Sequence, residues 1–220
     1  MLRHSYCEMR IMQRRITSTG VIVVRSNWGW RNHMEDAYVL QLLEPKFKEF
    51  HLLFCGYAEC EPLHSYGPAT RPNYIIHYVM GGKGIYQVGE KKYHISKGQI
   101  FLIEPESLTF YQADKEEPWT YLWVGFGGTE AKSFIQDVGL NRQLVCQCEG
   151  GEELKEIVFS MLKHTKSTTE NLYYLQGRLF DFFSVLAREI TLRQFEDNTA
   201  ESMHVQEAID YIKNNYSQGI

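Results

Sequence analysis

The side chains that most often bind metals or perform catalysis are spaced too irregularly in this chain to form a familiar site. The eight histidines stand at positions 4, 33, 51, 64, 77, 94, 164 and 204, and no two are separated by a single residue. Metal ligands on a strand converge most simply at that spacing, because alternate side chains share a face. The five cysteines form no CxxC pair, and the sequence contains no GxSxG, P-loop or GxGxxG motif. We therefore expect no metal, no cofactor and no catalytic residue.

Aromatic side chains offer a different chemistry, which is the recognition of a sugar. Trp119, Tyr121 and Trp123 alternate along a predicted strand and therefore share one face. The other face carries ordinary core residues, Leu122, Val124 and Phe126. A face of Trp and Tyr suits a wet pocket in which rings stack on a sugar while polar groups hydrogen-bond to its hydroxyls.

Four further side chains are candidates for the same pocket. Tyr111 lies on the neighbouring predicted strand, and Arg71 and His77 bracket the start of an earlier strand, where they can supply fixed hydrogen-bond donors. His64 precedes that strand as a lone histidine. A purely structural interpretation stays open, since Trp119 can pack at a rim and His77 can be a hydrogen-bonded core histidine.

The elements that must position these residues are short strands. From about residue 50 to residue 127, apolar segments alternate with turn signals at short intervals, which is typical of a sandwich or a small barrel. A tight hairpin connection is expected at residues 89–91. The predicted strands cover residues 51–56, 74–80, 85–88, 92–95, 100–103, 108–113 and 119–126.

After residue 128 the apolar period changes from two to about three and a half, so helices follow the strands. A short helix is expected before Gly139 and an amphipathic helix over residues 154–162. Ser167 and Glu170 form a capping box that opens a longer helix. One stripe of that helix carries Leu172, Leu175, Leu179, Phe182 and Leu186. Two interpretations of the stripe are open, packing on the core of the same chain or the seam of a dimer.

Composition defines a broad class of protein. The 220 residues are 44% apolar and 23% charged, and no apolar run approaches the ~20 residues of a membrane span, so we expect a globular protein. The net charge of −4 does not suggest a nucleic-acid coat. An odd number of cysteines without CxxC spacing favours free thiols and a cytoplasmic location.

Both ends of the chain differ from its middle. Residues 1–33 carry six Arg and one acidic residue, a charge of +5, so residues 34–220 carry −9. Such a leader imitates an organelle transit peptide, and it also fits a poorly structured extension of a protein whose translation starts at Met34. Residues 195–203 look like a polar linker, and one amphipathic helix follows it. That helix is expected to begin a second domain.

Four segments form a pattern with a known counterpart: CEPLHSYGPATRPNY (60–74), IHYVMGGKG (76–84), KGQIFLIEP (97–105) and FYQAD…PWTYLWVGF (110–126). Together they resemble the ligand-binding half of the AraC family of bacterial transcription regulators. The helix expected over residues 205–216 is similar to the first helix of that family's DNA-binding domain. The resemblance implies a cupin-like β-barrel that binds an effector, often a sugar, then helices that pair two subunits, then two helix-turn-helix motifs. It also favours Met34 as the start.

The resemblance implies which residues line the pocket. The family's sugar-binding prototype has an Arg before the first barrel strand, a Tyr after the Pro loop, and a His and a Trp two apart on the last strand. These positions correspond to Arg71, Tyr111, Tyr121 and Trp123. Tyr121 stands where the prototype has His, and the loop after Arg71 is shorter, so the same sugar is not implied. Thr109 replaces the family's common His after the Pro, which argues against a barrel metal.

We therefore expect an α+β fold in which a cupin-like, jelly-roll β-barrel precedes a helical dimerisation segment. The expected divisions are an extension (1–33), the effector-binding barrel (34–128), the dimerisation segment (129–194), a linker (195–203) and the start of a helix-turn-helix domain (204–220). The expected function is the effector-sensing and dimerisation portion of an AraC-type regulator that responds to a carbohydrate and binds DNA through its C-terminal domain. The alternatives are a free-standing dimeric sugar-binding module and a metal-independent cupin enzyme.

Overall fold

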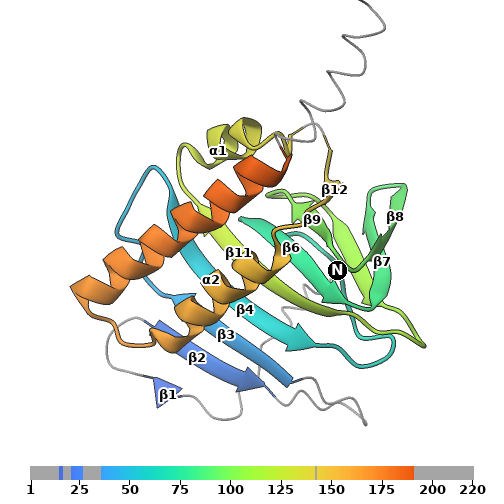
Figure 1. Cartoon of the computed structure of the whole chain (residues 1–220), viewed down its shortest axis with the longest axis horizontal. Coiled ribbons are helices and arrows are strands. Elements are labelled where there is room, and N and C mark those ends of the chain that lie inside the picture. The colour runs from blue at the N-terminus through green and yellow to red at the C-terminus, as the bar shows by residue number, and fades with distance from the viewer. Residues whose placement is uncertain (1–14, 17–20, 27–35, 142, 191–220) are drawn as a thin grey trace, which may run out of the picture.

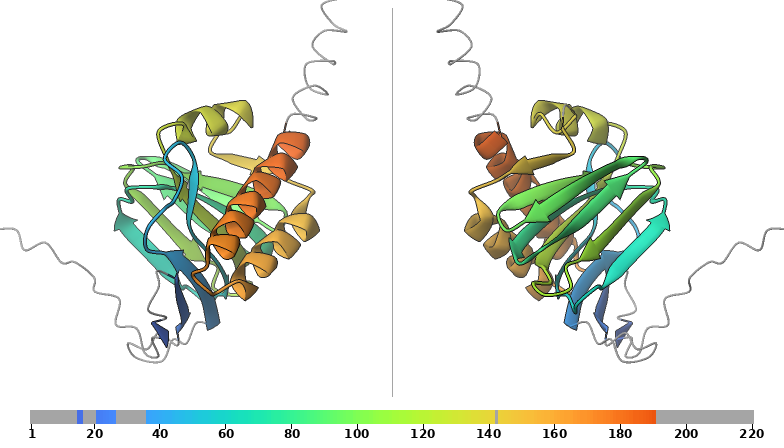
Figure 2. Two further views of the ribbon diagram at one scale, coloured as in Figure 1. Left: turned by 90° about the vertical axis from the view of Figure 1, so that its left-hand side faces the viewer. Right: turned by 90° about the vertical axis from the view of Figure 1, so that its right-hand side faces the viewer.

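The structure is a computed structural model, and it describes residues 15–16, 21–26, 36–141 and 143–190. These residues form three layers, as Figure 1 and Figure 2 show. Two helices lie across one face of a large sheet, and a smaller sheet covers the opposite face. Strands come first along the chain and helices follow, so the expected α+β class is confirmed.

The large sheet contains β1 (Arg15–Ile16), β2 (Val21–Ser26), β3 (Asp36–Leu42), β4 (His51–Glu59), β6 (Tyr74–Gly81), β9 (Gln99–Ile103), β11 (Thr120–Gly127) and β12 (Val145–Gln147). The small sheet contains β5 (Ser65–Ala69), β7 (Lys83–Val88), β8 (Lys91–Ser96) and β10 (Thr109–Ala113). Strands β4 to β11 divide into the orders β4-β11-β6-β9 and β5-β10-β7-β8. This four-on-four arrangement of antiparallel strands is a jelly roll.

The predicted cupin-like jelly roll is therefore confirmed, in the form of two facing sheets. Over the described residues, the ladders of the two sheets stay separate, and an isolated bridge joins Lys83 to Pro118. Each predicted strand is present, as β4 and β6 to β11. Strand β5 was not predicted because it contains Gly67 and Pro68, which usually mark turns. It lies at a sheet edge, where Pro is tolerated.

Part of the segment expected to be poorly structured is paired into the large sheet. Residues 21–26 form β2, whose register with β3 runs from Val21 opposite Leu42 to Ser26 opposite Ala37. The run of β-branched residues at 21–24 favours a strand. The rest of residues 1–33, apart from 15–16, lies outside the described residues, and so do the expected linker (195–203) and helix-turn-helix start (204–220).

The expected helices are α1 (Ala131–Asp137), α2 (Gly151–Lys163) and a long helix over residues 169–190. The cap of the long helix differs from the prediction: the hydroxyl oxygen of Thr168 accepts the N–H of Asn171 at 3.2 Å, so Thr168 takes the capping role predicted for Ser167. Within the described ranges, none of the helices has both the length and the apolar character needed to cross a membrane.

The apolar stripe of the long helix packs on the chain's own core. Leu172 is half-buried, and the other predicted stripe residues are fully buried, namely Leu175, Leu179, Phe182 and Leu186. The ring of Phe183 lies 5.0 Å from that of Phe126 on β11, and the Gln176 amide donates to the Phe50 carbonyl at 2.9 Å. Core packing thus accounts for the stripe, and pairing of two chains through this helix stays a prediction.

Candidate ligand-binding site

The inner face of the large sheet carries a row of side chains that crosses β3, β4, β11, β6, β9 and β12. The hydrogen-bonded register places six residues side by side, in the order Val39, Gly56, Trp123, His77, Phe101 and Val145. The row exists because alternate residues share a face and the register continues across the sheet. It brings the predicted Trp123 and His77 next to each other.

The small sheet faces this row with a row of tyrosines. The register pairs Tyr111 with Tyr66 on one side and with Tyr86 on the other, and Tyr86 then pairs with Tyr93. The guanidinium of Arg71 lies 3.9 Å from the centre of the Tyr66 ring, which is a cation–π contact. The rings of Tyr66 and Tyr111 stack at 5.6 Å. Arg71 and Tyr111 therefore belong to one aromatic interior between the sheets.

His77 lies at the centre of this interior. Its ring stacks on Phe101, with 4.4 Å between ring centroids and 3° between ring planes. The rings of Tyr111, Tyr121 and Trp123 lie 5.2, 5.3 and 6.4 Å from it. The structure thus gathers all the predicted effector residues except His64 in one cluster, namely Arg71, His77, Tyr111, Tyr121 and Trp123.

His64 and Trp119 occupy less expected positions. His64 precedes β5, where its N–H donates to the Glu61 carbonyl at 3.0 Å and its carbonyl accepts the N–H of Ala113 at 2.8 Å. Those bonds hold the loop against the end of β10, and a contact of the half-buried His64 ring with an effector stays a prediction. Trp119 is fully buried and stacks at 5.8 Å on Phe101, so it belongs to the interior and not to a rim.

Nitrogen atoms of three side chains in this interior are buried without a hydrogen-bond partner among the described residues: Nε of Arg71, Nδ1 of His77 and Nε1 of Trp119. Buried polar groups are nearly always paired, so these atoms mark places where a ligand can bond. Burial, with the charge of Arg71 adding to it, lowers the pKa of His77 to about 3. This interior therefore contains the Arg71 guanidinium and a neutral imidazole.

Other reactive groups are buried for structural reasons. Within the described residues, no three His, Cys, Asp or Glu side chains converge as metal ligands would. The cysteines at 55, 60, 146 and 148 are buried, and burial raises the pKa of the Cys55 thiol. The Thr109 hydroxyl is also buried and donates to the Ala69 carbonyl at 3.4 Å.

Sequence reasoning missed three residues that shape the inner face: Phe54, Gly56 and Gly125. On strands β4 and β11, Gly56 lies opposite Trp123, and Phe54 lies opposite Gly125. A Cβ at Gly56 would lie 2.1 Å from Cζ2 of Trp123, and a Cβ at Gly125 would lie 2.2 Å from Cε2 of Phe54. Each ring therefore lies across the glycine of the opposite strand. A glycine inside a strand pattern often marks a place where another group lies close to the backbone. This signal at Gly56 and Gly125 could have identified the site of close packing.

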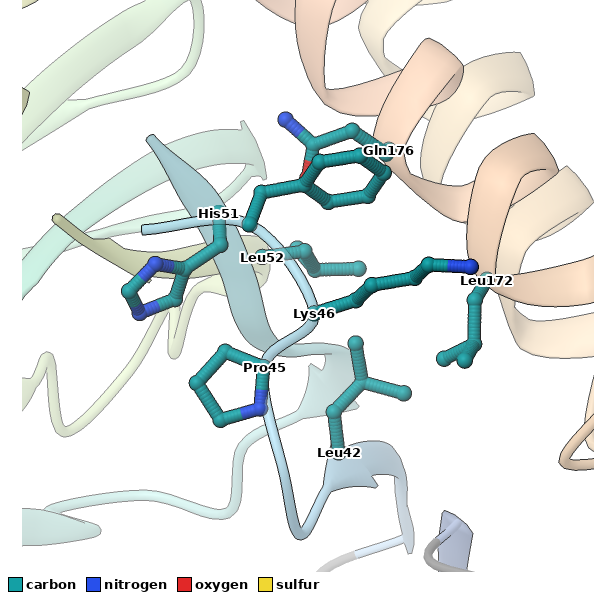
Figure 3. Close-up of a pocket in the computed structure, with 8 residues that line it drawn as sticks. Leu42, Pro45, Lys46, His51, Leu52, Leu172 and Gln176 are labelled. Atoms are coloured by element: carbon teal, nitrogen blue, oxygen red, sulfur yellow. The ribbon is translucent and has the colours of Figure 1, made fainter. Parts of the chain in front are cut away.

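A separate groove lies on the helix side of the large sheet, between residues 42–52 and the long helix (Figure 3). Its lining is mostly apolar, with Lys46, His51 and Gln176 as the polar members. Burial lowers the pKa of His51, and Gln176 donates its amide to the Phe50 carbonyl. The predicted effector residues do not line this groove, so the interior between the sheets is the candidate site.

Comparison with known proteins agrees with this architecture. The model of the AraC-like ligand binding domain family matches residues 51–173, and the chain belongs to this family. The matched region includes the row of tyrosines, the row on the large sheet except Val39, and the start of the long helix.

Three relatives are regulators of operons. The Msm operon regulatory protein of Streptococcus mutans serotype c is 28% identical over 168 residues, which cover 75% of this chain and 60% of that protein. The raffinose operon transcriptional regulatory protein RafR of Pediococcus pentosaceus is 28% identical over 184 residues, which cover 80% and 66%. The lactose operon transcription activator of Staphylococcus xylosus is 25% identical over 199 residues, which cover 82% and 67%. The chain thus spans about two thirds of the length of these relatives or less.

Proposed function

We propose that this chain is the effector-sensing and pairing portion of an AraC-type transcription regulator that responds to a carbohydrate. Two of the relatives are named for operons of sugars, raffinose and lactose. The observation that carries the proposal is the half-buried indole of Trp123, whose ring lies 6.4 Å from that of His77, in an interior where nitrogen atoms of His77 and Arg71 are buried without a partner. A flat aromatic face next to fixed polar atoms is what a sugar needs, because it has both apolar ring faces and hydroxyl groups.

Each residue has a distinct role in this proposal. Trp123 stacks on the face of a sugar ring, and the guanidinium of Arg71 donates to a ring substituent. Arg71 is held for this by its contact with Tyr66. Tyr111 and Tyr121, whose rings lie 5.2 and 5.3 Å from that of His77, orient the sugar, and His77 stays neutral and offers its unpartnered Nδ1.

Strand β11 connects the pocket to the helices. Trp123 faces the interior, while Val124 and Phe126 face the helix side, where Phe126 contacts Phe183 of the long helix. A sugar that binds one arrangement of strand and helix more tightly shifts the population towards it. DNA binding is proposed to belong to the C-terminal domain that the relatives' greater length allows, and catalysis plays no part.

Pairing of two chains is proposed to use the exposed face of the long helix. Its buried stripe is occupied by the chain's own core, whereas Tyr173 and Phe180 are 56% and 46% exposed. These side chains are the large apolar groups that the helix offers to a second copy within the described residues.

The test is calorimetric titration of the purified chain with galactose, lactose and raffinose. We expect at least one of them to bind, and Trp123→Ala to weaken that binding at least tenfold without loss of the far-ultraviolet circular dichroism spectrum. Trp123→Phe is the matched control, because it keeps a stacking ring and should retain part of the affinity. Absence of binding by the wild-type chain would overturn the proposal, and conversion of the sugar to a product would favour an enzyme.

A further inference from the structure

The inner face of β4 and β11 carries two aromatic rings in a reciprocal arrangement. Trp123 of β11 lies across Gly56 of β4, and Phe54 of β4 lies across Gly125 of β11. The two rings therefore occupy adjacent levels of the same strand pair, one ring extending over each strand. The levels are separated by two residues of strand, which is roughly 6.5 Å.

Phe54 resembles Trp123 in its accessibility. Both are half-buried, whereas Tyr111, Tyr121 and Phe101 of the same interior are buried. Both pack against the buried apolar cluster of the interior, and neither is fully buried itself. The accessible aromatic surface of the inner face thus continues from Trp123 to Phe54.

A polar side chain accompanies Phe54. Gln41 of β3 is the register partner of Phe54, just as Val39 is the register partner of Gly56. Alternation places Gln41 on the same face as Ala37, which belongs to the interior cluster. Gln41 is exposed, and its amide both donates and accepts hydrogen bonds, which suits a sugar hydroxyl.

We propose that Phe54 and Gln41 form a second sugar subsite beside Trp123, so that the effector is an oligosaccharide of at least two rings. This inference rests on the proposed function. One ring stacks on Trp123, and the next stacks on Phe54 and hydrogen-bonds to Gln41. The two glycines under the rings are about 8 Å apart, from roughly 6.5 Å along the strands and about 4.8 Å between neighbouring strands, which is a span that two or three linked sugar rings cover. Gly125 is a positioning residue, because any side chain there would displace the Phe54 ring.

The experiment compares galactose, lactose and raffinose in calorimetric titrations of the full chain, its Phe54→Leu variant and a control. Leu keeps the apolar packing of Phe54 but removes the flat stacking face. Tyr57→Leu is the matched control, since Tyr57 is a half-buried aromatic residue of the same strand that contacts Phe159 of α2 on the opposite face.

We expect the wild-type chain to bind lactose or raffinose about tenfold or more tightly than galactose, a factor typical of one added stacking contact. Phe54→Leu should remove this difference by weakening the binding of lactose or raffinose, while Tyr57→Leu should keep it. Equal binding of mono- and oligosaccharide, or an undiminished preference in Phe54→Leu, would overturn the second subsite and leave the proposed function standing. If no saccharide binds, both fail together.

Discussion

A single methyl group at Gly56 is the most direct perturbation of the Trp123 platform. The ideal Cβ position at Gly56 lies 2.1, 2.5 and 2.7 Å from Cζ2, Cε2 and Cη2 of Trp123. Carbon atoms in contact lie about 3.5–4.0 Å apart, so Gly56→Ala forces the indole to move by about 1.4 Å or more. The ring has little room for this, because the rings of Tyr121 and His77 lie 5.5 and 6.4 Å from it.

The displacement has two measurable consequences. Overpacking of this kind lowers the free energy of unfolding by about 1–3 kcal/mol. The smaller backbone entropy of the unfolded alanine variant offsets roughly 0.4–1 kcal/mol of that loss. Urea denaturation followed by circular dichroism should therefore show a net destabilisation. Calorimetric titration should show weaker binding of whichever saccharide the wild-type chain binds, because the stacking face is tilted.

Gly81→Ala is the matched control. Gly81 ends β6 in the same sheet, and a Cβ there would meet nothing within 4 Å. This variant should be as stable as the wild type or slightly more stable, with unchanged binding. In a Gly56→Ala, Trp123→Ala double variant, the methyl group should cost little further stability, because the ring that it displaces is gone. Equal stability and equal affinity of Gly56→Ala and Gly81→Ala would refute the close approach on which this reasoning depends.

Two other predictions concern His77 and the long helix. The pKa of His77 is near its ordinary value of 6.5 in the unfolded chain and about 3 in the folded chain. The free energy of unfolding should therefore decrease by about 1.4 kcal/mol for each unit by which the pH falls between these two values. His77→Phe should remove that slope from the pH dependence of urea unfolding, and an unaltered slope would contradict the burial argument. Leu179→Glu should unfold the chain, because it places a charge in the core, whereas Phe180→Glu should keep the fold. If the helix pairs two chains, sedimentation should show Phe180→Glu as a monomer; a dimeric Phe180→Glu or a folded Leu179→Glu would count against these assignments.

Much of the strand pattern was predictable because it is local. Alternation along residues 119–126 separates Tyr121 and Trp123 from Leu122 and Val124, and the two sets do belong to different clusters. The hairpin at Gly89 is present as a two-residue connection between Val88 and Lys91. Strands β1, β2, β3, β5 and β12 were not predicted. The turn residues of β5 and the short lengths of β1 and β12 give weak local signals that pairing with neighbours overrides, whereas β2 and β3 contain strand-forming residues that were not assigned.

The role of the long helix depended on information that the sequence lacks. The heptad-like stripe is equally suited to a core and to a dimer seam, because both bury the same apolar side chains. The outer face of the large sheet lies under that stripe, so Leu175, Leu179 and Phe182 are buried in one chain. Which surface covers a helix is a property of the tertiary structure.

By itself, the sequence determined the order of strands and helices, the aromatic face of β11 and the family pattern of residues 60–126. These follow from side-chain periodicity and turn chemistry, which act over a few residues. Only the tertiary structure decided that His77 lies between Phe101 and Trp123, that Arg71 rests on Tyr66, and that glycines let two rings lie across the sheet. The physical reason is register: contacts between strands far apart in the chain depend on hydrogen bonding and packing of the whole sheet.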